Sequence, residues 1–405
     1  MGELTLYLYP WDLLETGTEQ LVEWAARGGV DRLAVATSYH SAEYLAPRAR
    51  RDVYRTVEPN VAHLPLRPLA GDLSIRAGRL AVEHPALVER LATHAGRAGI
   101  GLTGWTVTLH NSELATSRPD AAVRNCFDDP SAHALCPTNP AVRQYGLELV
   151  SAVAATGYVD EIMAESLSFL LVPHGHPHEL SGVSLDLVTR ALLSLCFCVH
   201  CTGRGLDRGA DAARLKAWVA ETLRRRWNGP SLRAKTADVP SDGSDLLGLI
   251  WSVPDLQIWL SMRCDVVTEL LGAASAAVSD LGVTLNPAGA GWAPPAALGM
   301  LEGIDVGRLR DLPGRTVLLP YHRLLADVAR DLDYATSVSE ASRFQVLQTL
   351  WPAHHPGGLD DLLGKIGLAQ SAGFEQFGLY NYASATSVTL EWVEAVADQV
   401  HVRRP

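Results

Sequence analysis

Apolar and polar positions divide the chain into two kinds of segment that follow each other in turn. Short apolar runs are typical of strands buried on both faces, and longer segments with apolar residues at helical spacing are typical of amphipathic helices. The runs that predict strands are Leu4–Tyr9, Arg32–Thr37, Gly101–Leu109, Asp160–Ala164, Gly282–Leu285, Thr316–Leu319, Phe344–Leu347 and Phe377–Tyr380. The predicted helices are Thr18–Arg27, Pro85–Ala98, Pro140–Ala155, 208–226, 254–279, Leu359–Ala372 and Thr389–Gln399.

This order of elements predicts the fold class. Strands that are each followed by a helix indicate an α/β protein, here a right-handed (β/α)8 TIM barrel that forms a single domain over residues 1–405. The fourth and fifth strands are separated by an extended segment, about residues 170–280, which carries clustered cysteines and helical patterns. An open doubly wound sheet is the alternative. Tyr-Pro-Trp-Asp follows the first strand in place of a glycine-rich dinucleotide fingerprint, which favours the barrel.

Composition narrows the class of protein. The 405 residues carry a net charge of -11, which argues against a nucleic-acid partner. Nearly all positive charge is arginine, with Lys216, Lys235 and Lys365 the only lysines, as in proteins from GC-rich bacterial genomes. The N-terminus indicates a first strand rather than a signal peptide, and no apolar stretch reaches membrane-spanning length. We therefore expect a cytoplasmic protein with no membrane partner.

A cysteine cluster predicts a metal site. Cys196, Cys198 and Cys201 form a Cys-x-Cys-x-x-Cys run, and Cys136 lies alone upstream. Four thiolates brought together by the fold suit a closed, structural zinc site. Cys136 is the preferred fourth ligand, and Cys126 and His200 are the alternatives.

The ends of the predicted strands carry aromatic and hydrogen-bonding side chains. Reactive groups of a barrel gather at this end of its strands, and aromatic faces beside polar groups suit a sugar ring. The predicted substrate-binding residues are Trp11, Tyr39, His40, His110, Asn111, Asn286, Tyr321, His322, Gln348, Trp351, Tyr380 and Asn381. The loop that holds His174, His176 and His178 is either a substrate loop or plain surface, with a metal site as the less favoured interpretation.

Glu165 is the strongest catalytic candidate, because a carboxyl group at a strand end beside apolar walls can have a raised pKa and act as a general acid.

The region around Glu165 resembles glycoside hydrolase family 42, the microbial beta-galactosidases. That family combines a cysteine before a Ser-Pro-x-Tyr-Arg type of segment, an Asn-Glu at the fourth strand and a Cys-x-Cys-x-x-Cys zinc cluster. The matching residues here are 135–143, 163–166, Cys196, Cys198 and Cys201.

The resemblance implies that Glu165 is the acid/base residue and that the cysteines hold structural zinc. It also implies a homo-oligomer, because the family often forms trimers. Two features depart from the family. Ala164 stands where the family has asparagine, and residues 344–351 contain no carboxylate to serve as the nucleophile of the seventh strand. Asp12 and Glu113 are the candidates for a second carboxylate.

The sequence therefore predicts a glycoside-hydrolase-like enzyme that acts on a small glycoside or a sugar-derived metabolite, with Glu165 as general acid/base. One alternative is a non-hydrolytic barrel enzyme, an isomerase, epimerase or lyase of specialised metabolism. In that enzyme His40, His110 or His322 would exchange protons with Glu165. A further alternative is a non-catalytic carbohydrate-binding relative.

Overall fold

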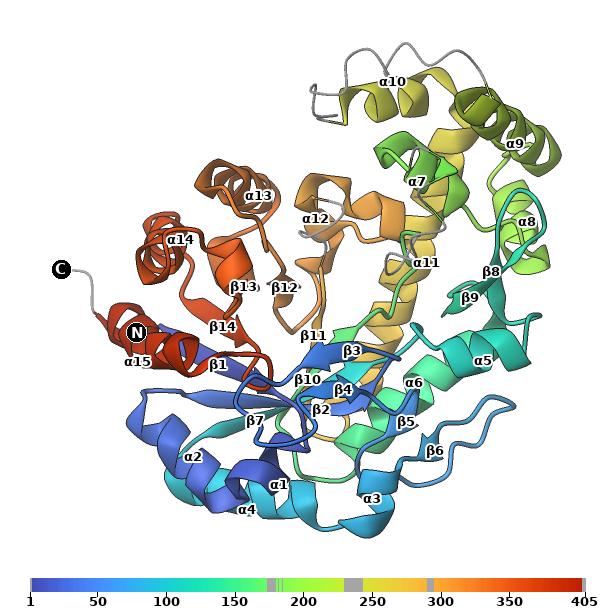
Figure 1. The fold of residues 1–405 in the computed structure, drawn as a ribbon. Helices are drawn as coiled ribbons and strands as arrows, with labels where there is room; N and C mark the ends of the chain where they lie inside the picture. Colours follow the sequence, from blue (N-terminus) through green and yellow to red (C-terminus); the bar gives the residue numbers. More distant parts are fainter. Residues whose placement is uncertain are drawn as a thin grey trace.

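The computed structural model describes residues 2–172, 180, 182–183, 185–228, 243–289 and 295–402. Eight parallel strands form a barrel in the centre of the molecule (Figure 1). They are β1 (Glu3–Leu8), β2 (Arg32–Tyr39), β7 (Gly101–Val107), β10 (Glu161–Glu165), β11 (Thr284–Pro287), β12 (Thr316–Leu318), β13 (Phe344–Thr349) and β14 (Gln376–Tyr380).

The strand order is β11-β10-β7-β2-β1-β14-β13-β12. A bridge between Ala288 and Val317, with a hydrogen bond of 2.7 Å from the Gly289 N–H to the Val317 carbonyl, brings the two ends of the sheet together. The predicted (β/α)8 TIM barrel is confirmed.

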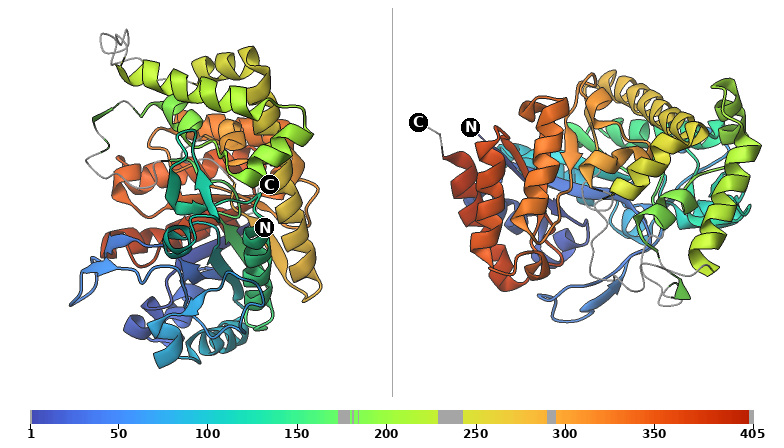
Figure 2. Two further views of the ribbon diagram at one scale, coloured as in Figure 1. Left: turned by 90° about the vertical axis from the view of Figure 1, so that its right-hand side faces the viewer. Right: turned by 90° about the horizontal axis from the view of Figure 1, so that it is seen from above.

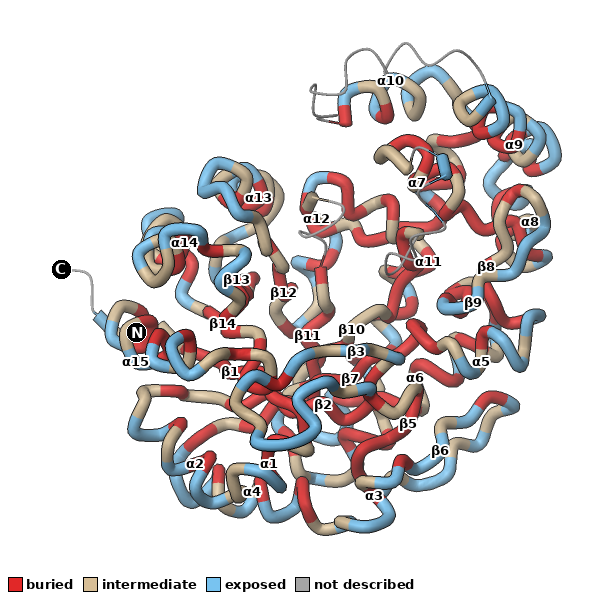
Figure 3. The backbone as a smooth tube through the Cα atoms, in the orientation of Figure 1, coloured by how far each residue is buried: buried red, intermediate tan, exposed pale blue. Residues whose placement is uncertain are grey.

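Helices surround the barrel, and their buried faces follow the apolar spacing of the sequence (Figure 3). In α4, for example, Leu87, Val88, Leu91 and Ala95 recur every three or four residues and are all buried. The helices around the barrel are α1 (Asp12–Thr16), α2 (Thr18–Arg27), α3 (Arg79–Glu83), α4 (Leu87–Ala98), α5 (Ser112–Ser117), α6 (Pro140–Ala154), α11 (Pro254–Ser279), α12 (Val306–Leu309), α13 (Leu325–Val338), α14 (Leu359–Ser371) and α15 (Ser387–His401).

The segment after β10 extends to one side of the barrel (Figures 1 and 2). It contains α7 (Leu187–Leu193), α8 (Val199–Asp207), α9 (Ala212–Asn228) and α10 (Ser244–Ser252), and it returns to the barrel through α11, which contacts α6 and β11. The cysteine run begins between α7 and α8 and ends in the first turn of α8, opposite a hairpin of β8 (Ala122–Arg124) and β9 (Pro130–Leu135). None of the described helices is long and apolar enough to cross a membrane.

A second elaboration lies between β2 and α4. It contains an antiparallel hairpin of β3 (Glu43–Leu45) and β4 (Tyr54–Thr56), then β5 (Val61–Ala62) and β6 (Arg76–Ala77). β5 pairs antiparallel with the end of β2, so this segment lies beside the carboxyl ends of the barrel strands. These ends form the barrel mouth.

Candidate functional site

Glu165 is the last residue of β10 and lies in the barrel mouth. The indole Nε1 of Trp105, on the neighbouring strand β7, donates a hydrogen bond of 2.6 Å to its Oε2. Burial raises the pKa of Glu165, and the Trp105 hydrogen bond opposes part of that rise because it favours the ionised form. The arrangement holds a carboxyl group in a fixed orientation and keeps its proton available at higher pH than a carboxyl group in water.

Tyrosines line the mouth around Glu165. The Tyr380 hydroxyl lies 3.2 Å from the Tyr9 hydroxyl and 3.0 Å from the Tyr39 hydroxyl. Burial raises the pKa of all three phenols, so they are neutral donors and acceptors at physiological pH. The Trp105 ring stacks on Tyr9 at a centroid distance of 5.5 Å.

Several predicted substrate-binding residues meet at this mouth. Tyr321 and Trp351 both contact the Tyr380 ring, at centroid distances of 6.1 and 5.4 Å. His40 stacks between Tyr39 and His110, with ring centroids 4.3 and 4.1 Å away. Rings and hydroxyl groups are therefore gathered at one end of the barrel, where Tyr321, Trp351 and Tyr380 are partly exposed. Partly exposed rings beside hydroxyl groups suit a neutral polyhydroxylated ligand.

Other predicted residues are engaged by the protein itself. Their side chains cap a helix, order a turn or reach toward the opposite end of the barrel. The partners are Leu114 and Tyr145 for Asn111, Ser384 for Asn381, Pro320 for Gln348, Asp331 for His322, and Glu161 and Arg315 for Asn286. The assignment of these side chains to substrate binding stays a prediction, and their contacts indicate structural roles.

Asn286 differs most from its expected position. The fifth strand covers Thr284–Pro287, two residues later than predicted, so Asn286 lies within the strand instead of after it. Its Nδ2 donates a hydrogen bond of 2.9 Å to Glu161, the first residue of β10. The amide therefore faces the N-terminal ends of the strands, where Arg32 and Arg315 also pair with Glu161.

The two candidates for a second carboxylate differ in setting. Asp12 is buried directly after β1 and accepts a 2.8 Å hydrogen bond from the Tyr9 N–H. Burial raises the pKa of Asp12 to about 7. Glu113 is exposed on α5 and forms a 3.3 Å ion pair with Arg76. β13 itself contains no carboxylate, as the sequence indicates.

Trp105 and Tyr7 were not predicted as site residues, because both lie inside strands and not at their ends. Alternation along a strand could have found them. Tyr7 in β1 and Tyr9 just after it are at alternate positions, as Trp105 and Val107 are in β7, and all four belong to one buried cluster inside the barrel.

The four predicted cysteines lie together. The Sγ atoms of Cys136, Cys196, Cys198 and Cys201 are all within 4.8 Å of one another. Cys136 Sγ lies 3.7, 3.6 and 3.5 Å from the other three. Four thiolates bound to zinc at about 2.3 Å have sulfurs about 3.8 Å apart, so the set fits a tetrahedral site, whereas disulfide sulfurs would be about 2.05 Å apart.

The surroundings also fit a metal with four thiolates, which carries a net negative charge. Arg263 is fully buried and lies close enough for its pKa to be raised by the thiolate charge, although burial lowers that pKa more. The Arg124 N–H donates a 3.3 Å hydrogen bond to Cys196 Sγ. Among the described residues, neither Cys126 nor His200 belongs to the group, and the loop with His174, His176 and His178 lies outside the described residues.

No protein-family model and no curated protein matches the sequence. Solved structures do match. The glycoside hydrolase domain of PgaB (BpsB) from Bordetella bronchiseptica aligns over 100% of both chains with a TM-score of 0.60 and 12% identity. The beta-galactosidase of Halorubrum lacusprofundi aligns with 98% of this chain and 58% of its own, with a TM-score of 0.56 and 12% identity.

A third match is the beta-galactosidase of Marinomonas ef1, with a TM-score of 0.55 and 11% identity over 98% of this chain and 59% of that chain. The chain thus spans less than two thirds of the length of both beta-galactosidases. At such identities the likeness shows the fold, and membership of family 42 stays a prediction. The chain shares its barrel fold with these three structures.

Proposed function

We propose that this protein is a glycoside-hydrolase-like enzyme with Glu165 as its general acid. The observation that carries the proposal is the carboxyl group of Glu165, which has a raised pKa, is held by Trp105 and is surrounded by neutral tyrosines. A sugar would stack on the rings while Glu165 protonates the leaving oxygen. The similar barrels are named as glycoside hydrolases or beta-galactosidases, which supports this class of reaction.

For the second carboxylate we favour Asp12 over Glu113. Asp12 lies beside Tyr9 at the mouth, and a carboxyl group with a pKa of about 7 is partly ionised at neutral pH. It would then take a proton from the attacking water. Glu113, in contrast, lies on the exposed face of α5 and forms an ion pair with Arg76.

We also propose that the four cysteines hold structural zinc. Bound zinc would supply no reaction step, because a site closed by four thiolates leaves no position open for substrate. Its effect would be to fix Cys136, which follows β9, to the segment that carries Cys196, Cys198 and Cys201.

The test is the Glu165→Gln variant assayed with a panel of methyl glycosides and disaccharides, whose leaving oxygen must be protonated before it departs. Glutamine keeps the shape of the side chain but cannot donate the acid proton, so we expect turnover to fall by about a hundredfold or more. Glu89→Gln, on the exposed face of α4, is the matched control. Equal turnover in the two variants, both folded by circular dichroism, would refute the role of Glu165.

A second candidate function is proton transfer without hydrolysis. One observation in its favour is that, among the described residues, no second carboxylate contributes to the raised pKa of Glu165, whereas hydrolysis needs a carboxylate partner. The other is the pair of stacked imidazoles, His40 and His110, at the mouth. Analysis of products distinguishes the two, because hydrolysis releases a free reducing sugar and isomerisation does not.

A further inference from the structure

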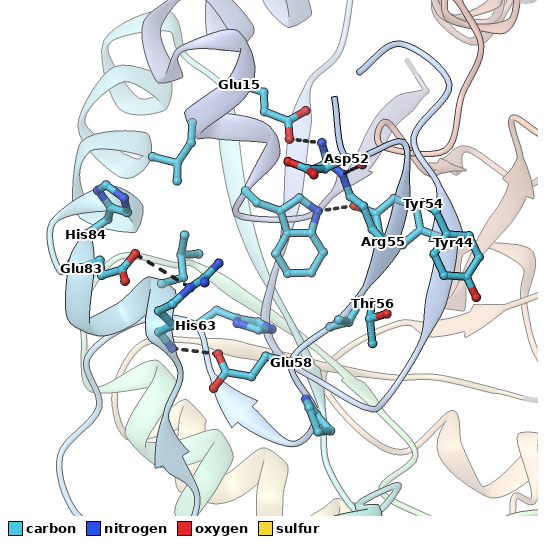
Figure 4. A pocket seen from close by; sticks show the side chains of 16 residues that line it. Glu15, Tyr44, Asp52, Tyr54, Arg55, Thr56, Glu58, His63, Glu83 and His84 are labelled. Atoms are coloured by element: carbon cyan, nitrogen blue, oxygen red, sulfur yellow. Dashed lines mark hydrogen bonds and ion pairs between the residues drawn. The ribbon is translucent and has the colours of Figure 1, made fainter. Parts of the chain in front are cut away.

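A second cavity lies beside the barrel mouth (Figure 4). Its volume is about 740 Å³, within the range of about 300–1,000 Å³ that is typical of ligand sites. Its walls come from α1, the β3–β4 hairpin, α3 and the residues after β5. The segment between β2 and α4 thus builds a site of its own, as long loops on the carboxyl side of a barrel often do.

Both arginines that line the cavity pair with acidic side chains. Arg55 pairs with Glu15, and the two side chains face one another in Figure 4. Arg79 pairs with Glu83 at 3.9 Å and also donates its backbone N–H to Glu58 at 2.8 Å. Because the arginines are neutralised in this way, the lining suits a neutral polar ligand better than an anion.

His63 supplies a polar group without a partner. The side chain lines the cavity and is only 3% exposed, and within the described residues its Nε2 has no hydrogen-bond partner. Burial lowers its pKa to about 4, so the imidazole is neutral at physiological pH. A ligand hydroxyl can serve a neutral imidazole as donor or as acceptor.

Aromatic rings connect this cavity to Glu165. His63 meets Trp11 edge to face at a centroid distance of 5.4 Å, and Trp11 stacks on Tyr9 at 4.6 Å. Tyr9 in turn stacks on Trp105, which holds Glu165. At the outer rim Tyr54 is 63% exposed and offers another ring.

We propose that this cavity is a second carbohydrate subsite, which holds a sugar unit of the same glycan chain whose scissile bond lies at Glu165. The inference rests on the proposed function and makes the substrate an oligosaccharide or polysaccharide instead of a small glycoside. The exposed Tyr54 ring, a neutral imidazole and arginines paired with acids match a neutral sugar ring. The ring contacts that lead from His63 to Trp105 place the cavity near Glu165.

The test uses the Glu165→Gln protein, which would bind without turnover. It is applied to immobilised β-linked galacto-, gluco- and N-acetylglucosamine oligosaccharides, from disaccharide to hexasaccharide. We expect the hexasaccharide of one series to be retained at least tenfold more tightly than its disaccharide. Adding His63→Gln or Tyr54→Ala should reduce that ratio by about tenfold, the effect of losing one hydrogen bond or one stacking contact.

Val82→Ala is the matched control, because Val82 is exposed on the same helix as Arg79 but does not line the cavity. Tyr54 is exposed, so its truncation cannot act through the core. Retention of no glycan, or of disaccharide and hexasaccharide alike, would overturn the subsite. Length-dependent retention of a glycan that the wild-type protein does not cleave would support the subsite and refute the proposed function.

Discussion

Replacing Asp12 by asparagine should stabilise the protein at alkaline pH. Asparagine has the shape of a protonated aspartic acid, and its Oδ1 can still accept the 2.8 Å hydrogen bond from the Tyr9 N–H. The wild-type side chain, in contrast, must ionise while buried, and burial raises its pKa from 3.8 to about 7. That difference corresponds to about 4 kcal/mol of free energy of unfolding.

The sign follows from proton binding. Between about pH 4 and pH 7 the folded protein keeps the Asp12 proton and the unfolded chain has lost it, so wild-type stability falls as pH rises. The asparagine side chain of the variant does not titrate, and every other titrating group is common to both proteins. We therefore expect equal stability near pH 4 and an advantage of about 2–4 kcal/mol for Asp12→Asn near pH 8, allowing for relaxation around the charge.

The assay is urea unfolding followed by tryptophan fluorescence at the two pH values, with Asp280→Asn at the exposed end of α11 as the control. An advantage of the same size at both pH values would show that ionisation of Asp12 is not its cause. If Asp12 is also the second carboxylate, Asp12→Asn should be more stable but less active than the wild-type protein, a common trade-off at catalytic sites.

Turnover that depends on protonated Glu165 should fall as pH rises through its raised pKa, seen as the alkaline limb of the pH–kcat profile. Metal analysis should find about one zinc per chain, lost in Cys136→Ser, and chelation should lower Tm. Lys365→Met should lower the free energy of unfolding, measured with urea, by about 2–4 kcal/mol. The variant loses the hydrogen bonds of 2.7 Å that Lys365 Nζ donates to the backbone carbonyls of His322 and His354.

The barrel could be predicted because its strands and helices bury apolar faces in a regular pattern. The helix expected at Thr18–Arg27 has those bounds in the structure, and most strands lie within two or three residues of the expected positions. The β3–β4 hairpin was missed, because its residues are mostly exposed and carry no apolar alternation. Its place is set by contacts made in the folded chain, which local patterns do not contain.

The candidate site could be predicted only in part, for the same physical reason. Glu165 and the cysteines were found because strand ends and cysteine spacing are local features. The Trp105 hydrogen bond joins residues that are 60 positions apart, and the approach of His63 to Trp11 depends on how the segment after β2 folds back. Asn111 fits a helix cap as well as it fits a binding site, and only the structure distinguishes the two.

Hydrogen bonds and ring contacts connect the cysteine cluster to the barrel mouth. Leu135 precedes Cys136, and its backbone N–H donates a hydrogen bond of 3.0 Å to the carbonyl of Leu109, just after β7. On the other side, buried Arg263 donates to the Ser194 carbonyl at 2.9 Å, two residues before Cys196.

The guanidinium of Arg263 also lies 4.0 Å from the centre of the Phe169 ring, which follows β10 and Glu165. The cluster therefore braces the ends of the two strands that carry Trp105 and Glu165. A metal held by the cysteines would then affect the proposed reaction without taking part in it, because a general acid is effective only when its orientation is fixed.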